Sequence, residues 1–159
     1  MSEQEKQALV TSLRLLAATP KSRKGLAQKL QEKGFSGDIV EGTLNRLEKQ
    51  GLLNDRSLAQ SLLQSYIYHR PSGRRRIAFE MRKRGIKDAV VKELLEKYTP
   101  EEEKERALEL ARARQLRWKR LDEAKRRKKI YDFLVRRGFD FGLSREVAGE
   151  VEKEQSSNE

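Results

Sequence analysis

The stretch Ser72-Gly-Arg-Arg-Arg-Ile-Ala-Phe-Glu-Met-Arg-Lys-Arg-Gly-Ile-Lys-Asp-Ala-Val-Val-Lys-Glu-Leu-Leu95 contains the structural plan of the whole chain. Ile77 and Met81 lie one helical turn apart and form an apolar stripe, while basic residues fill most of the remaining helix surface. Gly85 follows three basic residues and is the expected left-handed cap of this helix. Asp88 is suited to cap a second helix with one apolar face. The stretch therefore predicts a short helix, a glycine corner and another helix.

The same pattern occurs twice more in the chain. In every copy a glycine is followed by Phe or Ile, and apolar residues precede it by four and eight positions. The three glycines are spaced 51 and 53 residues apart. The aligned positions are Leu26, Leu30, Gly34, Phe35, Ile39, Leu44 and Leu47 in the first copy, Ile77, Met81, Gly85, Ile86, Val90, Leu95 and Tyr98 in the second, and Ile130, Leu134, Gly138, Phe139, Leu143, Ala148 and Val151 in the third. Three matches in register indicate a tandem helical repeat whose units bury their apolar faces partly against one another.

The start and stop signals of the helices set the expected domain organisation. They predict nine helices, three in each repeat, and no strand. The fold class is therefore all-α, with three tandem three-helix units. We expect the first unit to span residues 1–54, the second and most basic unit 55–98, and the third 99–159.

Two helices of the third unit have distinct predicted ends. The sequence Thr99-Pro-Glu-Glu-Glu is typical of a helix start, because threonine caps, proline fits the first position and acids meet the positive end of the dipole. We expect this helix to continue to Leu121, with Trp118 as a core anchor between units. The last helix is predicted over residues 143–154, and residues 155–159 are expected to form a frayed polar tail.

The composition favours thin helical layers and excludes several classes of protein. Only 36% of the 159 residues are apolar and 38% are charged. No apolar run is long enough to span a membrane, and the first residues lack the pattern of a signal peptide. Cysteine is absent, so disulfides and thiolate chemistry are excluded, and a reducing cytoplasm is the expected location.

The net charge of +11 is concentrated in two segments. Residues 70–87 carry a net charge of +7, and residues 112–137 carry +9, so the rest of the chain is acidic. Charge runs on helices are often only solvated faces. Two stripes that lead into equivalent helices of a repeat nevertheless favour a surface that faces a polyanion.

The central helix provides the most regular part of this basic surface. Arg75 and Arg82 are seven residues apart, as are Arg76 and Lys83, so each pair points the same way across two turns. Phe79 lies on the same side of the helix as Arg76 and Lys83. The core of its own repeat does not require it, so it is either a contact residue or a packing residue between units. The candidate contact residues for such a polyanion are Arg74, Arg75, Arg76, Phe79, Arg82, Lys83, Arg84, Lys125, Arg126, Arg127, Lys128, Lys129, Arg136 and Arg137.

Enzyme chemistry has little support in the sequence. The only histidine, His69, has no cysteine or second histidine as a partner for a metal site. The acids Glu101 to Glu103 are explained by the helix dipole, and the glycines are isolated corners rather than a phosphate-binding loop. We therefore expect no catalytic residue, no metal and no cofactor, and we predict that the protein is not an enzyme.

In order along the chain, several motifs resemble those of one known family. They are Leu13-x-Leu-Leu-Ala, Ser22-Arg-x-x-Leu-x-x-Lys-Leu, Lys33-Gly-Phe, Leu44-x-x-Leu-x-x-x-Gly-Leu-Leu-Asn-Asp, Arg75-Arg-Ile-x-x-Glu-Met-Arg-Lys-Arg-Gly-Ile and Phe133-Leu-x-Arg-Arg-Gly-Phe. Their order and spacing over residues 8–151 are similar to those of the RecX family of bacterial recombinase regulators. Three positions depart from the family pattern: Asn54 replaces a common acid, Leu58 replaces a common phenylalanine, and Phe141-Gly142 is an insertion in the third corner.

The resemblance implies a fold and a function. The family's fold is three tandem three-helix units that form an elongated, curved array. Its partner is the filament of the RecA recombinase on DNA, whose ATP hydrolysis and strand exchange it modulates, usually by inhibition. We therefore expect a monomeric cytoplasmic regulator of recombination, DNA repair and the SOS response, with contacts to DNA phosphates and none to a membrane. The family has no active-site motif, so the contact residues above rest on charge and spacing alone.

Two other functions remain open at this point. One is an independent DNA-binding protein in which one glycine-cornered helix pair acts as a helix-turn-helix, although such a motif is usually present once in a domain rather than three times. The other is a nuclease or other enzyme, which lacks any constellation of acids, histidine and metal ligands.

Overall fold

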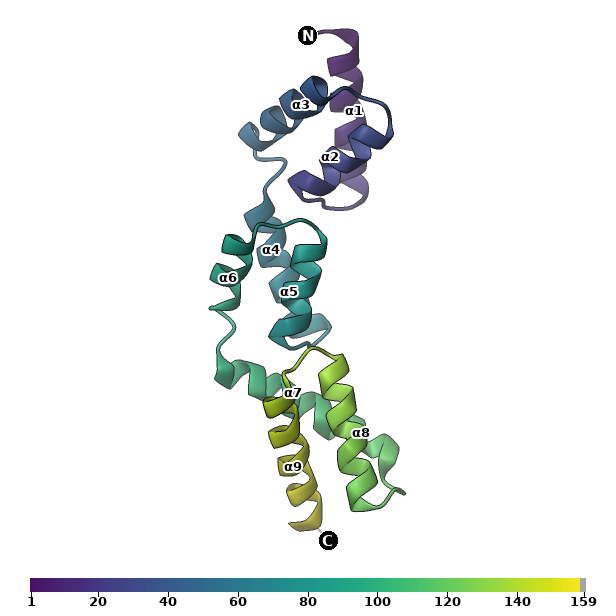
Figure 1. Ribbon diagram of the computed structural model, residues 1–159, viewed down its shortest axis with the longest axis vertical. Coiled ribbons are helices and arrows are strands. Elements are labelled where there is room, and N and C mark those ends of the chain that lie inside the picture. Colours follow the sequence, from purple (N-terminus) through teal and green to yellow (C-terminus); the bar gives the residue numbers. More distant parts are fainter. Residues whose placement is uncertain (158–159) are drawn as a thin grey trace. The chain divides into compact units, whose positions relative to one another are not determined.

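The computed structural model describes residues 1–157, and within this range the chain is helical and has no strand. The all-α prediction is confirmed. Figure 1 shows the nine α-helices of the described residues. They are α1 (Glu3–Ala18), α2 (Arg23–Glu32), α3 (Gly37–Lys49), α4 (Asp55–Gln64), α5 (Arg74–Lys83), α6 (Asp88–Leu95), α7 (Pro100–Arg114), α8 (Glu123–Arg136) and α9 (Phe141–Ser157). A π-helical turn, Ser65–His69, follows α4, and a 3₁₀ turn, Gln115–Trp118, follows α7.

Side-chain caps explain where most of these helices begin. The Ser22 hydroxyl accepts a hydrogen bond from the Gly25 amide, and the Thr99 hydroxyl accepts one from the Glu102 amide. Each cap satisfies one of the amides that a helix start leaves without a partner. The Thr99 cap agrees with the sequence prediction. Helix α3 begins at Gly37, and the Ser36 hydroxyl caps it by accepting a hydrogen bond from the Ile39 amide.

The glycine corners are the clearest repeated feature of the structure. Gly34, Gly85 and Gly138 have φ values of +93°, +84° and +93°, a region that residues with a Cβ atom rarely adopt. The residue after each glycine donates a backbone hydrogen bond across the corner. These bonds join Phe35 to Leu30, Ile86 to Met81 and Phe139 to Leu134, all at 3.1 or 3.2 Å. The predicted repeat is thus confirmed at the level of single hydrogen bonds.

The contacts divide the chain into two compact units. We call them the first unit, residues 1–61 and 81–91, and the second unit, residues 62–80 and 92–159. These two compact units differ from the three three-helix repeats predicted from the sequence. The core of the first unit lies where α1, α2 and α3 pack together. Its buried residues are Leu26, Leu30, Val40, Leu44, Leu47 and Leu53. The domain boundaries expected from the sequence, after residues 54 and 98, stay a prediction.

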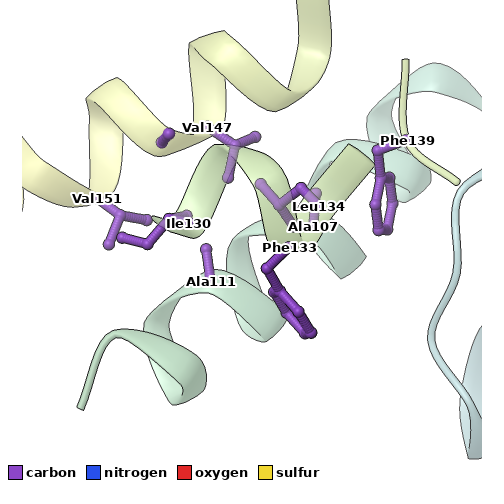
Figure 2. Packing of buried hydrophobic residues seen from close by; sticks show 9 residues of the cluster. Ala107, Ala111, Ile130, Phe133, Leu134, Phe139, Val147 and Val151 are labelled. Carbon is purple, nitrogen blue, oxygen red and sulfur yellow. The ribbon is translucent and has the colours of Figure 1, made fainter. Parts of the chain in front are cut away.

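The core of the second unit is built by α7, α8 and α9. Figure 2 shows small side chains of α7, Ala107 and Ala111, beside larger side chains of the other two helices. The small residues of α7 let its axis approach the other two helices closely. Most of the buried side-chain volume therefore comes from residues of α8, α9 and the corner between them. The larger members of this cluster are Ile130, Phe133, Leu134, Phe139, Val147 and Val151.

In the third repeat, the predicted end of α7 and both predicted ends of α9 are wrong. Helix α7 ends at Arg114 rather than Leu121, because the chain reverses through the 3₁₀ turn before Asp122 caps α8. Trp118 is partly buried against the core of the second unit and does not pack between two repeats as expected. Helix α9 runs over Phe141–Ser157, longer at both ends than predicted.

Ion pairs explain the extra length of α9. The carboxylate of Glu152 is buried against Arg126, and that of Glu154 binds Arg112 with an Nη2–Oε1 distance of 2.7 Å. These contacts attach the last turns of α9 to α8 and α7. The frayed tail expected from residue 155 is therefore wrong as far as Ser157, and the last two residues of that tail lie outside the described residues.

Candidate nucleic-acid interface

In the second unit the corner between α8 and α9 packs directly on the start of α5. The Gly73 amide donates a hydrogen bond to the Arg137 carbonyl at 2.9 Å, and the Arg75 amide donates one to the Gly138 carbonyl at 3.2 Å. These bonds satisfy amides at the helix start that have no intrahelical partner. A Cβ atom on Gly73 would come within 2.3 Å of the Gly138 carbonyl oxygen, so only glycine permits this approach. The contact brings two basic segments that are distant in sequence to one place.

The first unit repeats this contact with different residues. The Ser22 hydroxyl donates a hydrogen bond to the Arg84 carbonyl, which has the same repeat position as the Arg137 carbonyl. A Cβ atom on Gly85 would come within 2.5 Å of the Lys24 side chain. Gly34 has no preceding repeat, and a Cβ atom there would meet nothing within 4 Å. The glycine corner is therefore also the joint by which one repeat packs on the repeat before it.

Five arginines gather around the joint of the second unit, and we refer to them as the arginine junction. They are Arg75 and Arg76 on α5, Arg114 at the end of α7, and Arg136 and Arg137 at the end of α8. Within residues 1–157 none of the five forms an ion pair with an acid. Three of them, Arg75, Arg76 and Arg136, are exposed.

Arg137 is the most enclosed member of the arginine junction. It donates a hydrogen bond to the Pro71 carbonyl at 2.8 Å, and its guanidinium lies 5.9 Å from the Phe133 ring centre. Arg114 lies over the same ring at 4.4 Å. Burial lowers the pKa of the Arg137 guanidinium below its usual value, and the positive charges of Arg76 and Arg114 lower it further. Positive charge is thus gathered here without compensation, which is the condition that favours a bound anion.

Two of the predicted contact residues are held inside the fold instead. Arg74 binds the buried Glu103 with an Nε–Oε1 distance of 2.9 Å and also donates to the Tyr98 carbonyl. Arg126 binds Glu152, whose side chain is 2% exposed. A buried acid needs its cation, so these two arginines stabilise the fold.

The remaining predicted contacts lie at or near the surface. The exposed ones are Arg75, Arg76, Phe79, Arg82 and Lys83 on α5, and Lys125, Arg127, Lys128, Lys129 and Arg136 on α8. Three of them have an acid within 4.0 Å in the same region of the chain: Arg82 pairs with Asp88, Lys125 with Asp122 and Lys128 with Asp132. Arg84 is half-buried, and its carbonyl accepts the hydrogen bond from Ser22 described above.

A second basic feature of the same unit is an open groove between α8 and α9. Its lining includes Arg127, Lys128 and Tyr131 from α8 and Arg145 from α9. The sequence analysis did not select Arg145, because it lies alone in a segment without a basic run. It also missed Phe141 and Arg114, although the insertion of Phe141 into the third corner is a signal that could have identified this residue.

The described residues offer little for catalysis. They contain no group of three His, Cys, Asp or Glu side chains arranged to hold a metal ion. The one histidine is exposed at the end of the π-helical turn. Over the same residues, none of the helices combines the length and the apolar character that a membrane crossing requires.

Comparison with known proteins gives one consistent result. Three family models match consecutive parts of the chain: the RecX first three-helix domain matches residues 8–47, the second matches 54–95, and the third matches 101–147. The regulatory protein RecX of Streptomyces coelicolor is 33% identical over 153 residues, which cover 96% of this chain and 81% of the relative. The regulatory protein RecX of Chlorobium phaeobacteroides is 32% identical over 147 residues, covering 92% and 95%.

Solved structures share the fold. The crystal structure of RecX from Lactobacillus salivarius matches with a TM-score of 0.84 at 22% identity and covers 95% of this chain and 98% of its own. A second crystal structure of a regulatory protein RecX matches with a TM-score of 0.81 at 26% identity, covering 91% and 73%. The three tandem three-helix units expected from the sequence are therefore confirmed.

Proposed function

The chain belongs to the RecX family of regulatory proteins, and from this premise we propose that it binds the filament of a RecA-type recombinase on DNA. In this proposal the protein inhibits ATP hydrolysis and strand exchange by the recombinase and has no enzymatic activity of its own. It acts as a monomer in the cytoplasm, in DNA repair and the SOS response. The DNA, single- or double-stranded, is contacted through its phosphates.

The arginine junction is the observation that best supports the DNA contact. Its five guanidinium groups have no acidic partner within residues 1–157, and three of them are exposed. A guanidinium binds phosphate oxygens through two parallel hydrogen bonds, which are stronger than bonds between neutral groups. Burial, and then repulsion from Arg76 and Arg114, lowers the pKa of Arg137, and a phosphate placed here would offset that repulsion. The joint therefore suits a phosphate backbone better than an acidic protein side chain acting alone.

The groove between α8 and α9 adds a second set of cations in the same compact unit. Arg127, Lys128 and Arg145 line it, and Lys129 is exposed on the same helix. Two cationic regions on one rigid unit act as linked sites, because binding at one raises the effective concentration of ligand at the other. This arrangement favours a long polyanion over a small phosphate-bearing ligand.

The proposal is tested by the ATPase activity of a RecA-type recombinase on single-stranded DNA, titrated with the full-length protein. The test variant is Arg75→Gln/Arg76→Gln/Arg136→Gln, which removes three exposed charges from the arginine junction. We expect wild-type protein to inhibit and the variant to inhibit less. Binding to single-stranded DNA alone should lose up to about 0.7 from its log–log salt slope for each phosphate contact removed.

A matched control separates local contact from net charge. The variant Lys6→Gln/Lys33→Gln/Lys49→Gln removes the same charge from exposed positions of the first unit. It should keep the inhibition and the salt slope of the wild-type protein. Equal loss in both triple variants would show that only net charge matters. If the full-length protein leaves the recombinase unaffected at molar excess but binds naked duplex tightly, the independent DNA-binding function replaces this proposal.

A further inference from the structure

An exposed row of alternating aromatic and guanidinium groups lies beside the arginine junction. The Arg75 guanidinium lies over the Phe141 ring at 5.2 Å from its centre. Phe79 is one helical turn after Arg75 on α5, so the two side chains are neighbours on the same face of the helix. We refer to Phe79, Arg75 and Phe141 as the aromatic row. It joins the start of α9 to the face of α5.

Both rings of the aromatic row are open to solvent. Phe79 is 61% exposed and Phe141 is 53% exposed, and neither belongs to the buried core cluster of the second unit. Single exposed apolar residues are common and need no explanation. Two phenylalanines that flank an arginine without an acidic partner form a patch with a defined chemistry, since they offer flat apolar faces and positive charge together.

We propose that the aromatic row stacks on the bases of single-stranded nucleic acid while the neighbouring arginines hold its phosphates. Bases stack on aromatic side chains with little regard to sequence, and a guanidinium also stacks on their faces. In a duplex the bases are already stacked on one another and cannot lie against a protein surface. The aromatic row therefore prefers a single strand, whereas phosphate contacts alone would accept either form.

Charge favours nucleic acid over an apolar protein partner at this row. Arg75 belongs to the row, and the adjacent members of the arginine junction, Arg76 and Arg136, are exposed and form no ion pair within residues 1–157. An apolar protein surface would remove water from these charges and offer them no hydrogen-bond or charge partner. A single strand supplies a base for each ring and a phosphate for each guanidinium.

Another exposed aromatic–arginine pair in the same unit provides the contrast. Tyr68 is 55% exposed, and the Arg106 guanidinium lies 5.9 Å from its ring centre. In this case acids surround the pair: Arg106 binds Glu105 and Glu109, and the Tyr68 hydroxyl is 3.3 Å from a carboxylate oxygen of Glu102. The Tyr68 ring is as exposed as the rings of the aromatic row and also lies beside a guanidinium, but the side chain of Arg106 is only 18% exposed and its charge is already neutralised. It is therefore a matched control.

The inference deepens the proposed function by naming the ligand, and its test needs no recombinase. The full-length protein is titrated against a fluorescent oligothymidylate and against an oligonucleotide of the same length made of abasic units, with anisotropy as the readout. Both strands have the same phosphates, so the ratio of their affinities reports base contacts alone. We expect wild-type protein to prefer the strand with bases, and to prefer it over the matching duplex.

The row variant is Phe79→Leu/Phe141→Leu, which keeps apolar volume at two exposed positions and removes both rings. We expect it to bind oligothymidylate more weakly by about 5- to 150-fold for each ring that stacks. Its affinity for the abasic strand and its salt slope should stay at the wild-type values. Tyr68→Leu should change none of these quantities. Melting followed by circular dichroism checks that the variants are folded.

Two results would overturn the inference. The first is equal affinity of the wild-type protein for strands with and without bases. The second is an unchanged affinity of the row variant for oligothymidylate. If that variant also no longer inhibits the recombinase, the row is a protein contact and the proposed function still stands. Conversely, a base preference without any effect on the recombinase would refute the proposed function and support the aromatic row.

Discussion

Adding one methyl group to Gly73 tests the joint between α5 and the following glycine corner. The new Cβ atom would lie 2.3 Å from the Gly138 oxygen and 2.4 Å from both the Gly138 carbonyl carbon and the Phe139 nitrogen. All three are backbone atoms, so no side-chain rotation can relieve the contact. In Gly73→Ala the start of α5 and the corner must therefore move apart.

The size of the effect follows from what the movement breaks. Two backbone hydrogen bonds cross the joint, from Gly73 to Arg137 and from Arg75 to Gly138. Their loss costs about 1 kcal/mol each, and overpacking of a close contact adds about 1–3 kcal/mol. For a chain of this length, each kcal/mol lowers Tm by about 2–4 °C. We expect Gly73→Ala to lower Tm by about 6–20 °C in thermal melts followed by circular dichroism.

The matched control is the same substitution where space is available. Gly42 lies within α3, and a Cβ atom there would meet nothing within 4 Å. Alanine is favoured over glycine inside a helix, so Gly42→Ala should raise stability by about 0.5–1 kcal/mol. Gly73→Ala should therefore lower the stability of the protein, and Gly42→Ala should raise it. If Gly73→Ala melts at the wild-type temperature or above, the close approach of the corner to α5 is wrong.

Three further outcomes follow from the geometry. Gly138→Ala adds left-handed strain, at φ +93°, to a clash with the first turn of α5, and should lower Tm more than the substitution just described. Glu152→Gln leaves the enclosed Arg126 without its counter-charge, and urea denaturation should show a loss of about 3–5 kcal/mol. Arg112 holds the pKa of Glu154 below its usual value through a hydrogen bond, so the pair stabilises the fold above the ordinary carboxylate pKa and less as pH falls. The Tm difference between wild type and Arg112→Gln should therefore shrink in acid and persist at neutral pH.

Most of the helical order could be predicted from the sequence because its signals are local. A glycine at positive φ, a capping serine or threonine, and apolar residues one turn apart act within a few residues of one another. Gly34, Gly85 and Gly138 therefore marked the corners correctly, and Thr99 marked the start of α7. The same motifs, in the same order, identified the family. Helix ends that depend on distant partners, as at the end of α9, were predicted wrongly.

Only the tertiary structure decided which arginines of a basic run are bound by buried acids and which stay exposed. Arg74 and Arg75 are adjacent and chemically identical, yet the first is bound by Glu103, 29 residues away, while the second remains exposed beside Phe141. Arg126 is likewise bound by Glu152, 26 residues away. An acid that packing buries must take a cation with it, and the backbone direction at each position decides which neighbour it takes. The sequence by itself determined where positive charge accumulates, and packing determined which of those charges are bound by buried acids and which stay exposed.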